Sequence, residues 1–330
     1  MDLSLFAHSR RDAWLVGIAA LEITLTSYAT LTFGSVPIVA SIALASACVF
    51  LNCTNYQCVA HNFIHNRFFR SAKLNVAFSI FNTLALLVPQ SLYRIHHLDH
   101  HKHNNDRPAR PGGRALDRTS TYRYSRKHDR EEHIVAYAFV GPFRTDLGFL
   151  YEGARRQDHA RFVWVEVATL LLYMGMLTLG NWRGALLLFL PIWYLGQVVA
   201  LAENYLEHHH AIPGNRLTDS VSSYGVIYNW LWFNNGYHQE HHYRPQLHWT
   251  RMKELRAEML PDSQRRVVSG AHWFNFDPPW SRSRTNLPVN AESAAMDGAE
   301  AQGDADRTAP KPGKTALMSR RQDQKGIDVR

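Results

Sequence analysis

Long apolar stretches alternate with polar segments along this chain of 330 residues. Four of them are close to the roughly 20 residues that an α-helix needs to cross a bilayer. They cover residues 13–33, 37–60, 162–179 and 184–206, and short turns at 34–37 and 180–183 separate the members of each pair. The pattern predicts an all-α integral membrane protein that contains two transmembrane helical hairpins.

A fifth apolar stretch, residues 74–92, contains several polar side chains and a proline. Histidine clusters lie before it and after it, and they could not share a metal site if this stretch crossed the bilayer. We therefore predict an interfacial or re-entrant helix here, which Ser79, Asn82 and Pro89 permit.

The charged residues give the predicted spans a direction. The formal net charge is +8 and the sequence pI about 9.5. Lys and Arg concentrate at the N-terminus, in residues 66–161 and after residue 243, whereas the two hairpin turns carry only Arg183. This distribution predicts a multi-pass protein whose hairpins begin and end on the cytoplasmic side. It favours a lipid bilayer over a nucleic acid as the partner of the basic residues.

A soluble α-helical protein is the alternative, and the mean hydropathy of -0.28 is compatible with it. Long polar segments account for that average, because the four apolar runs are nearly continuous. We expect residues 1–283 to form one membrane domain. Residues 284–330 have almost no aromatic side chains and predict a disordered tail.

Histidine is the unusual residue of this composition, with 19 copies concentrated in four clusters. They read HNFIH at 61–65, HHLDHHKH at 96–103, NYLEHH at 204–209 and HQEHH at 238–242. Residues spaced i, i+4 share one face of a helix, which suits two imidazoles on one metal ion. Asn62 stands where a zinc peptidase of the HExxH type has its glutamate base, so the sequence argues against a peptidase.

One helical face per cluster gives nine histidines: His61, His65, His97, His100, His101, His208, His238, His241 and His242. That number is about twice what one first-row metal ion binds, so we predict a two-metal centre. Imidazole binds iron, zinc and copper alike, and ligand type therefore leaves the metal open.

The clusters HNFIH, HLDHH and HQEHH, in this order, resemble the histidine boxes of the membrane fatty acid desaturase and hydroxylase superfamily. The resemblance extends from His61 to Pro245 and favours the desaturase branch. It implies a non-haem di-iron centre, dioxygen as co-substrate and electrons from another protein. It also adds Asn204, spaced NxxxH before His208, to the predicted metal ligands.

The resemblance implies a desaturase of an acyl chain or a similar aliphatic substrate. A hydroxylase of the same fold and a desaturase of a small amphipathic metabolite are the alternatives. A metal transporter would need ligands along its spans, whereas these clusters follow the ends of apolar segments. The three cysteines, Cys48, Cys53 and Cys58, form no CxxC pair. We therefore expect an external ferredoxin, rubredoxin or cytochrome, with its reductase, to supply electrons.

Some assignments stay open at this point. His96 and His97 compete for one ligand position, and His209 or His210 could replace His208. Several acids among the clusters could orient imidazole rings, namely Asp99, Glu203, Glu207 and Glu240. Isolated histidines in polar segments, such as His248 and His272, are expected on the surface.

Overall fold

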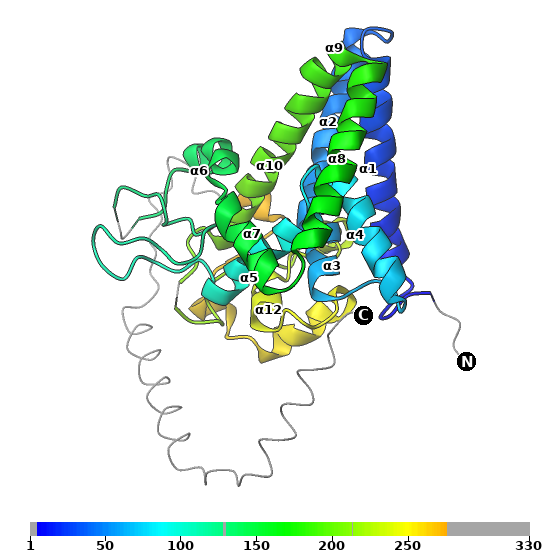
Figure 1. Ribbon diagram of the computed structural model, residues 1–330. Coiled ribbons are helices and arrows are strands. Elements are labelled where there is room, and N and C mark those ends of the chain that lie inside the picture. Colours follow the sequence, from blue (N-terminus) through cyan, green and yellow to red (C-terminus); the bar gives the residue numbers. More distant parts are fainter. Residues whose placement is uncertain (1–4, 128–129, 213, 276–330) are drawn as a thin grey trace. The chain divides into compact units, whose positions relative to one another are not determined.

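The computed structural model describes residues 5–127, 130–212 and 214–275, which belong to one compact unit, Met1–Pro278. The predicted tail, 284–330, and its boundary lie outside these residues. The described part is mostly helical (Figure 1). Its strands β1 (Ser222–Ser223) and β2 (Val267–Val268) have two residues each and pair in parallel.

Four helical segments are long and apolar enough to cross a membrane, as the sequence predicts: Asp12–Thr32, Ile38–His65, Ala160–Gly180 and Trp182–His208. The first is α1 (Asp12–Thr32) and the third is α8 (Ala160–Gly180). The second combines α2 (Ile38–Thr54), η1 (Asn55–Ala60) and α3 (His61–His65). The fourth combines α9 (Trp182–Gly184), η3 (Ala185–Phe189) and α10 (Leu190–His208).

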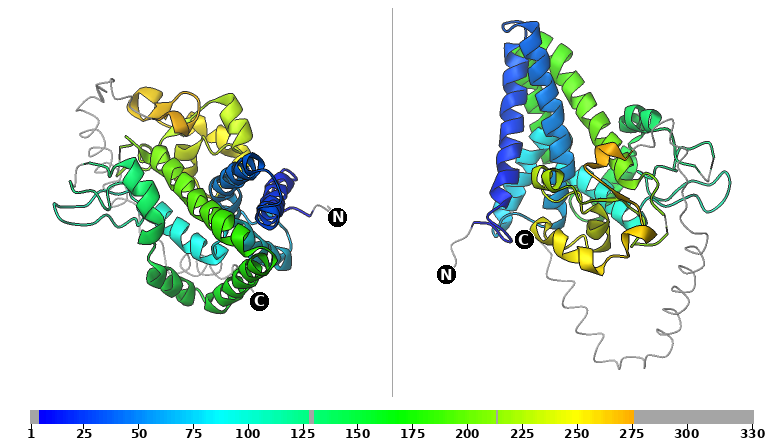
Figure 2. Two further views of the ribbon diagram at one scale, coloured as in Figure 1. Left: turned by 90° about the horizontal axis from the view of Figure 1, so that it is seen from above. Right: turned by 180° about the vertical axis from the view of Figure 1, so that it is seen from behind.

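Figures 1 and 2 show these four segments running alongside one another. The α9 end of this bundle lies away from α3, α5 and α12, which gather at the opposite end (Figure 1). All four histidine clusters are therefore found near one end of the bundle.

A π-helical segment, η1, lies directly before the first histidine box. π-Helices bond i→i+5 and are rare outside single turns near functional sites. The extra residue per turn changes which side of the chain faces the bundle core. In this case all residues of η1 and of the following helix α3 are buried, including His61 and His65.

The fifth apolar stretch is broken in the structure into α4 (Ala72–Leu86) and α5 (Gln90–His103), whose axes differ by 86°. Leu87 follows the last residue of α4 in the left-handed conformation, with φ 59°, and Pro89 directly precedes α5. A proline at this position cannot continue the helix before it. The single helix 74–92 of the sequence prediction is thus two helices. The sharp turn directs α5, which carries the second histidine box, back under the bundle.

Shorter elements surround the histidine end. They are α6 (Ile134–Val140), η2 (Gly141–Arg144), α7 (Leu147–Arg156), α11 (Val226–Leu231), α12 (His238–Tyr243), η4 (Trp249–Glu258), η5 (Asp262–Gln264) and η6 (His272–Phe274). The largest apolar core joins side chains of α1, η1, α3 and α4, among them Leu15, Phe63 and Phe78. This core holds the first histidine box against the bundle.

A buried polar network links four helices inside the bundle. The Glu22 carboxylate accepts hydrogen bonds from Asn52 Nδ2 at 2.9 Å and Asn55 Nδ2 at 2.8 Å. Asn55 also bonds Asn82, which bonds Gln90 at the start of α5. Polar groups at bilayer depth need such partners, and this network connects the position of α5 to α1 and α2.

Replacing Gly196 by alanine should destabilise this network. The added Cβ would lie 2.1 Å from Asn52 Oδ1, and Asn52 is held in place by Glu22 and by the Ala85 carbonyl oxygen. We expect a loss of about 1–3 kcal/mol, typical of overpacking, visible as a lower thermal unfolding midpoint in detergent. Gly175→Ala on α8 is the control, because an added Cβ there has nothing within 4 Å. Equal midpoints for the two variants would contradict the prediction.

Candidate metal centre

The nine predicted histidines meet in two adjoining groups. The first group contains His61, His65, His97, His101 and His241, and the second contains His100, His208, His238 and His242. One ring nitrogen of each member lies within 4.8 Å of those of the other members of its group. Segments separated by up to 180 residues therefore converge as the sequence interpretation requires.

The rings of the first group approach one another through their Nε2 atoms. The Nε2–Nε2 distance is 2.7 Å between His65 and His97, and 2.8 Å between His61 and His241. His101 Nε2 is 3.0 Å from those of His97 and His241. Histidines that precede the α4–α5 turn thus lie beside histidines that follow it. This arrangement agrees with the prediction that residues 74–92 do not cross the bilayer.

The second group is built in the same way from α5, α10 and α12. His208 Nε2 is 3.0 Å from His100 Nε2 and 3.3 Å from His238 Nε2. The His242 ring lies 4.9 Å, centroid to centroid, from those of His100 and His208. Two buried ring nitrogens of this group, His238 Nδ1 and His242 Nε2, have no hydrogen-bond partner in the described structure.

Each histidine doublet is divided between the groups. On α5, His101 belongs to the first group and His100 to the second; on α12, His241 belongs to the first and His242 to the second. Consecutive residues of an α-helix point about 100° apart, so a doublet on one helix serves two neighbouring positions. The HxxHH spacing thus supplies ligand atoms to both groups from a single helix.

Hydrogen bonds made by Nδ1 atoms fix the orientation of two rings of the second group, those of His100 and His208. His100 Nδ1 is 2.7 Å from the Asp117 carboxylate, and His208 Nδ1 is 3.0 Å from the Asp219 carbonyl oxygen. A carbonyl oxygen and an ionised carboxylate only accept hydrogen bonds, so both Nδ1 atoms carry the proton. When neither ring carries a second proton, the lone pairs of the two Nε2 atoms face each other.

Two lone pairs 3.0 Å apart repel unless a cation lies between them. A metal ion about 2.1 Å from each nitrogen places neighbouring ligand nitrogens about 3 Å apart at a right angle. The Nε2–Nε2 separations of 2.7–3.3 Å agree with that geometry. The residues present therefore fit a metal ion in each group.

Burial favours the neutral state that a metal ligand requires. It lowers the pKa of His238, His241 and His242 on α12 well below the usual value, with the neighbouring imidazoles acting in the same direction. These three rings are uncharged near neutral pH. Their nitrogens can bind a metal ion without first releasing a proton.

The structure separates some of the alternatives that the sequence left open. His97 belongs to the first group, whereas His96 lines the adjoining cavity. His208 belongs to the second group, whereas His209 bonds Glu131 and lies with His210 in a partly exposed cluster. Asn204 lies in the cavity wall, and its Nδ2 donates to the Tyr137 hydroxyl at 2.7 Å.

Most of the four acids that could orient imidazole rings contact other residues instead. Asp99 contacts Arg118 and His103, Glu203 accepts from Tyr228, and Glu240 accepts from Ser222. Glu207 alone of the four approaches a histidine of the groups, 3.7 Å from His238 Nδ1. The carboxylate that orients a ring directly is Asp117, which lies in a loop without a recognisable spacing and was missed.

Two isolated histidines are buried, contrary to the expectation of a surface position. His272 is fully buried between the Tyr228 hydroxyl and the Val221 carbonyl oxygen. His248 bonds Asp12 at the start of α1 at 3.1 Å. Both connect the segments that follow the third histidine box to the rest of the domain, which local sequence could not reveal.

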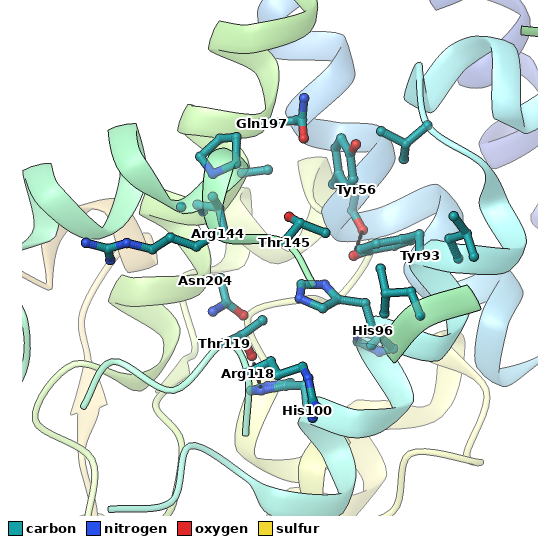
Figure 3. Close-up of a pocket in the computed structure, with 18 of the residues that line it drawn as sticks. Tyr56, Tyr93, His96, His100, Arg118, Thr119, Arg144, Thr145, Gln197 and Asn204 are labelled. Carbon is teal, nitrogen blue, oxygen red and sulfur yellow. Dashed lines mark hydrogen bonds between the residues drawn. The ribbon is translucent and has the colours of Figure 1, made fainter. Parts of the chain in front are cut away.

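A cavity of about 210 Å³ adjoins both groups, and four of their histidines line it: His61, His97, His100 and His238. Most other lining side chains are apolar or aromatic, including Val88, Leu92, Leu150 and Tyr93. Figure 3 shows Tyr56, Tyr93 and His96 on one side, and Asn204, Thr145 and Arg144 facing them. An aliphatic chain in this cavity would lie beside the histidines and away from bulk water.

Asp117→Asn should weaken metal binding to the second group. An amide accepts less strongly from His100 Nδ1–H than a carboxylate, and loss of such an outer partner typically costs about 10–100-fold in metal affinity or activity. Metal titration of the purified protein would measure the change. Asp99→Asn is the control, since Asp99 contacts Arg118 and His103 and neither histidine group. A similar affinity for both variants would contradict this role of Asp117.

Comparison with known proteins agrees with this geometry. A family model described as fatty acid desaturase matches residues 35–272. A sphingolipid delta(4)-desaturase from Candida albicans (strain SC5314 / ATCC MYA-2876) is 28% identical over 307 residues. That similarity covers 83% of this chain and 78% of the relative. The family match includes all four histidine clusters.

Proposed function

Since this chain belongs to the fatty acid desaturase family, we propose that it holds two iron ions and uses dioxygen to introduce a C=C bond into a long aliphatic chain. The chain is an oxidoreductase of the desaturase class. The observation that carries the proposal is the cavity, largely apolar, that reaches both histidine groups.

In this proposal His61, His65, His97, His101 and His241 hold one iron, and His100, His208, His238 and His242 hold the other. Asn204 completes the second set, because it lies one helical turn before His208 and lines the same cavity. When bound, an iron pair supplies dioxygen chemistry able to remove hydrogen from an unactivated C–H bond.

The protein's own residues position that chemistry. Asp117 and the Asp219 carbonyl oxygen hold the rings of His100 and His208 by their outer nitrogens. Leu92, Leu150 and Tyr93 give the cavity an apolar surface that excludes water and binds methylene groups. The carbon atoms that lie beside His97 and His238 are the ones we expect to lose hydrogen.

The name of the relative supports a substrate class. A protein similar over most of this chain carries the name sphingolipid delta(4)-desaturase. We infer that this chain also acts on the aliphatic part of a lipid of the sphingolipid kind. The apolar cavity supports this inference, since it offers a long chain more contacts than a small polar metabolite.

We also propose an orientation of the protein in the membrane and a source of its electrons. The four apolar segments form two hairpins with the histidine end facing the cytoplasm, which the concentration of Lys and Arg outside the hairpin turns supports. Electrons come from a separate ferredoxin, rubredoxin or cytochrome with its reductase. The three cysteines of the chain, which form no CxxC pair, support an external source.

The experiment is mass spectrometry of host lipids with and without the active gene. A desaturase product is two hydrogen atoms lighter than its substrate, whereas a hydroxylase product contains one additional oxygen. We expect the first change in a long-chain lipid. An oxygenated sole product would favour the hydroxylase alternative. An unchanged lipid fraction with an altered small metabolite would favour a desaturase of a small amphipathic metabolite.

A further inference from the structure

The segment formed by α6 and η2 packs against the middle of a candidate membrane span. The Tyr194 hydroxyl on α10 donates to the Phe139 carbonyl oxygen at 2.8 Å, and the Tyr194 ring lies 5.6 Å from that of Phe143. Tyr194 follows Trp182 by twelve residues, which corresponds to about 18 Å along a helix. Because a hydrocarbon core is about 30 Å thick, α6 and η2 lie at bilayer depth.

The outer face of this segment is apolar and exposed. The exposed apolar side chains of α6 and η2 are Val135, Phe139, Val140 and Phe143, with Phe143 at 75%. An apolar patch of this kind on a protein surface marks contact with a partner or a membrane. Neighbouring α10 also exposes Leu190 and Leu195, so the patch is continuous with the apolar surface of a candidate span. Lipid acyl chains are therefore its occupant.

The inner face of the same segment lines the cavity beside the histidine groups. Gly141, Pro142 and Arg144 of η2 contribute to the lining, and Leu147 at the start of α7 adds to it. Gly141 allows a close approach to α10, because a Cβ there would lie 2.6 Å from Leu201 Cδ1. A single turn of chain thus separates the cavity from the position of the acyl chains.

The two arginines of the lining are each paired with an acid. Arg144 bonds Glu132 at 2.7 Å and lies over the Tyr124 ring, while Arg118 lies 3.4 Å from Asp99 and over the Phe149 ring. Thr119, Thr145 and Asn204 line the same region. Paired guanidinium groups beside hydroxyl and amide groups suit a head group that forms neutral hydrogen bonds better than one bearing several phosphates.

We propose that the substrate reaches the cavity from within the bilayer, past α6 and η2, as a lipid whose uncharged head carries hydroxyl or amide groups. This inference rests on the proposed desaturase function of the same cavity. It excludes a water-soluble thioester of a long chain as the main substrate. Phe139 and Phe143 contact the bilayer at the point of access, and Pro142 and Leu147 form the wall between lipid and cavity.

Photo-crosslinking of the full-length protein in lipid nanodiscs tests the route. One probe is a long-chain N-acyl amino alcohol with a diazirine in its acyl chain, embedded in the same bilayer. The other is a long-chain coenzyme A thioester with the same diazirine, added from solution. We expect the lipid probe to label both the α6–η2 segment and cavity residues of α5, and the thioester to label α5 roughly tenfold less. Stronger labelling of α5 by the thioester would overturn the proposal.

A pair of variants tests the role of the exposed face. Phe143→Asn makes the outer face of η2 polar and should reduce labelling of α5 by the lipid probe roughly tenfold. Leu179→Asn is the matched control, since Leu179 on α8 is also highly exposed and does not line the cavity. Equal labelling of α5 in both variants and the unchanged protein would also overturn the proposal.

The crosslinking result does not depend on whether the protein catalyses desaturation. Crosslinking needs no turnover, so labelling by the lipid probe would support the access route even if mass spectrometry showed a hydroxylated product. A desaturated product from a protein labelled only by the thioester would support the function and overturn the route.

Discussion

His241→Ala should abolish lipid desaturation and remove the metal ion of the first group. His241 Nε2 lies 2.8 Å from His61 and 3.0 Å from His101, so its loss opens the centre of that group. Loss of an outer partner already costs about 10–100-fold, and we expect loss of a ligand to reduce turnover by more than roughly 100-fold. Iron analysis of the purified variant and product quantification by mass spectrometry measure the two effects.

His209→Ala is the control for this variant. Its ring is paired with Glu131 and belongs to neither group, so metal content and turnover should stay close to those of the unchanged protein.

A second comparison contrasts His97→Ala with His96→Ala. Only the first should lose metal, because His96 lines the cavity and lies outside both groups. Full iron content in His241→Ala would show that the ligand assignment is wrong.

Leu92→Trp should block the substrate and leave the metal bound. Leu92 lines the cavity beside the histidines, and the larger indole would occupy space needed by an aliphatic chain. A substrate displaced by about 1 Å from its reactive position typically reacts on the order of 100-fold more slowly. We expect a loss of that size in turnover, measured in nanodiscs with a long-chain lipid, and unchanged iron content.

Leu98→Trp provides the matched control on the same helix. Leu98 also belongs to α5 and is partly buried, but it is not part of the cavity lining. Its turnover should stay within a small factor of that of the unchanged protein. Unimpaired turnover in Leu92→Trp, or equal losses in both variants, would argue against this cavity as the substrate site.

The parts of the fold that depend on local spacing could be predicted from the sequence. The four apolar runs match the candidate spans within a few residues, because a bilayer imposes a minimum helix length on the chain itself. The nine histidines were identified because i, i+3 and i+4 spacing already places rings together on a helix. His97 was preferred because it keeps the HxxHH form of the desaturase boxes, and His208 because it lies four residues after Asn204. The structure places both in the groups.

The parts that depend on distant contacts could not be predicted. Asp117 bonds His100 from a loop of irregular sequence, and only the folded chain brings them within 2.7 Å. His272 appeared isolated because its partners, Tyr228 and Val221, are 44 and 51 residues away. The turn between α4 and α5 depends on a left-handed Leu87, a conformation for which leucine carries no signal.

On the proposed ligand assignment, the divided histidine doublets predict that the two metal positions fill cooperatively. Helices α5 and α12 each supply nitrogens to both groups, so an ion bound in one group immobilises two helices that the other group also uses. Binding of the first ion then accounts for most of the entropy lost when the two helices become immobile. The second ion therefore binds more tightly than it would alone. By reciprocity, losing either ion loosens the other, and partly loaded molecules should be scarce in an iron titration.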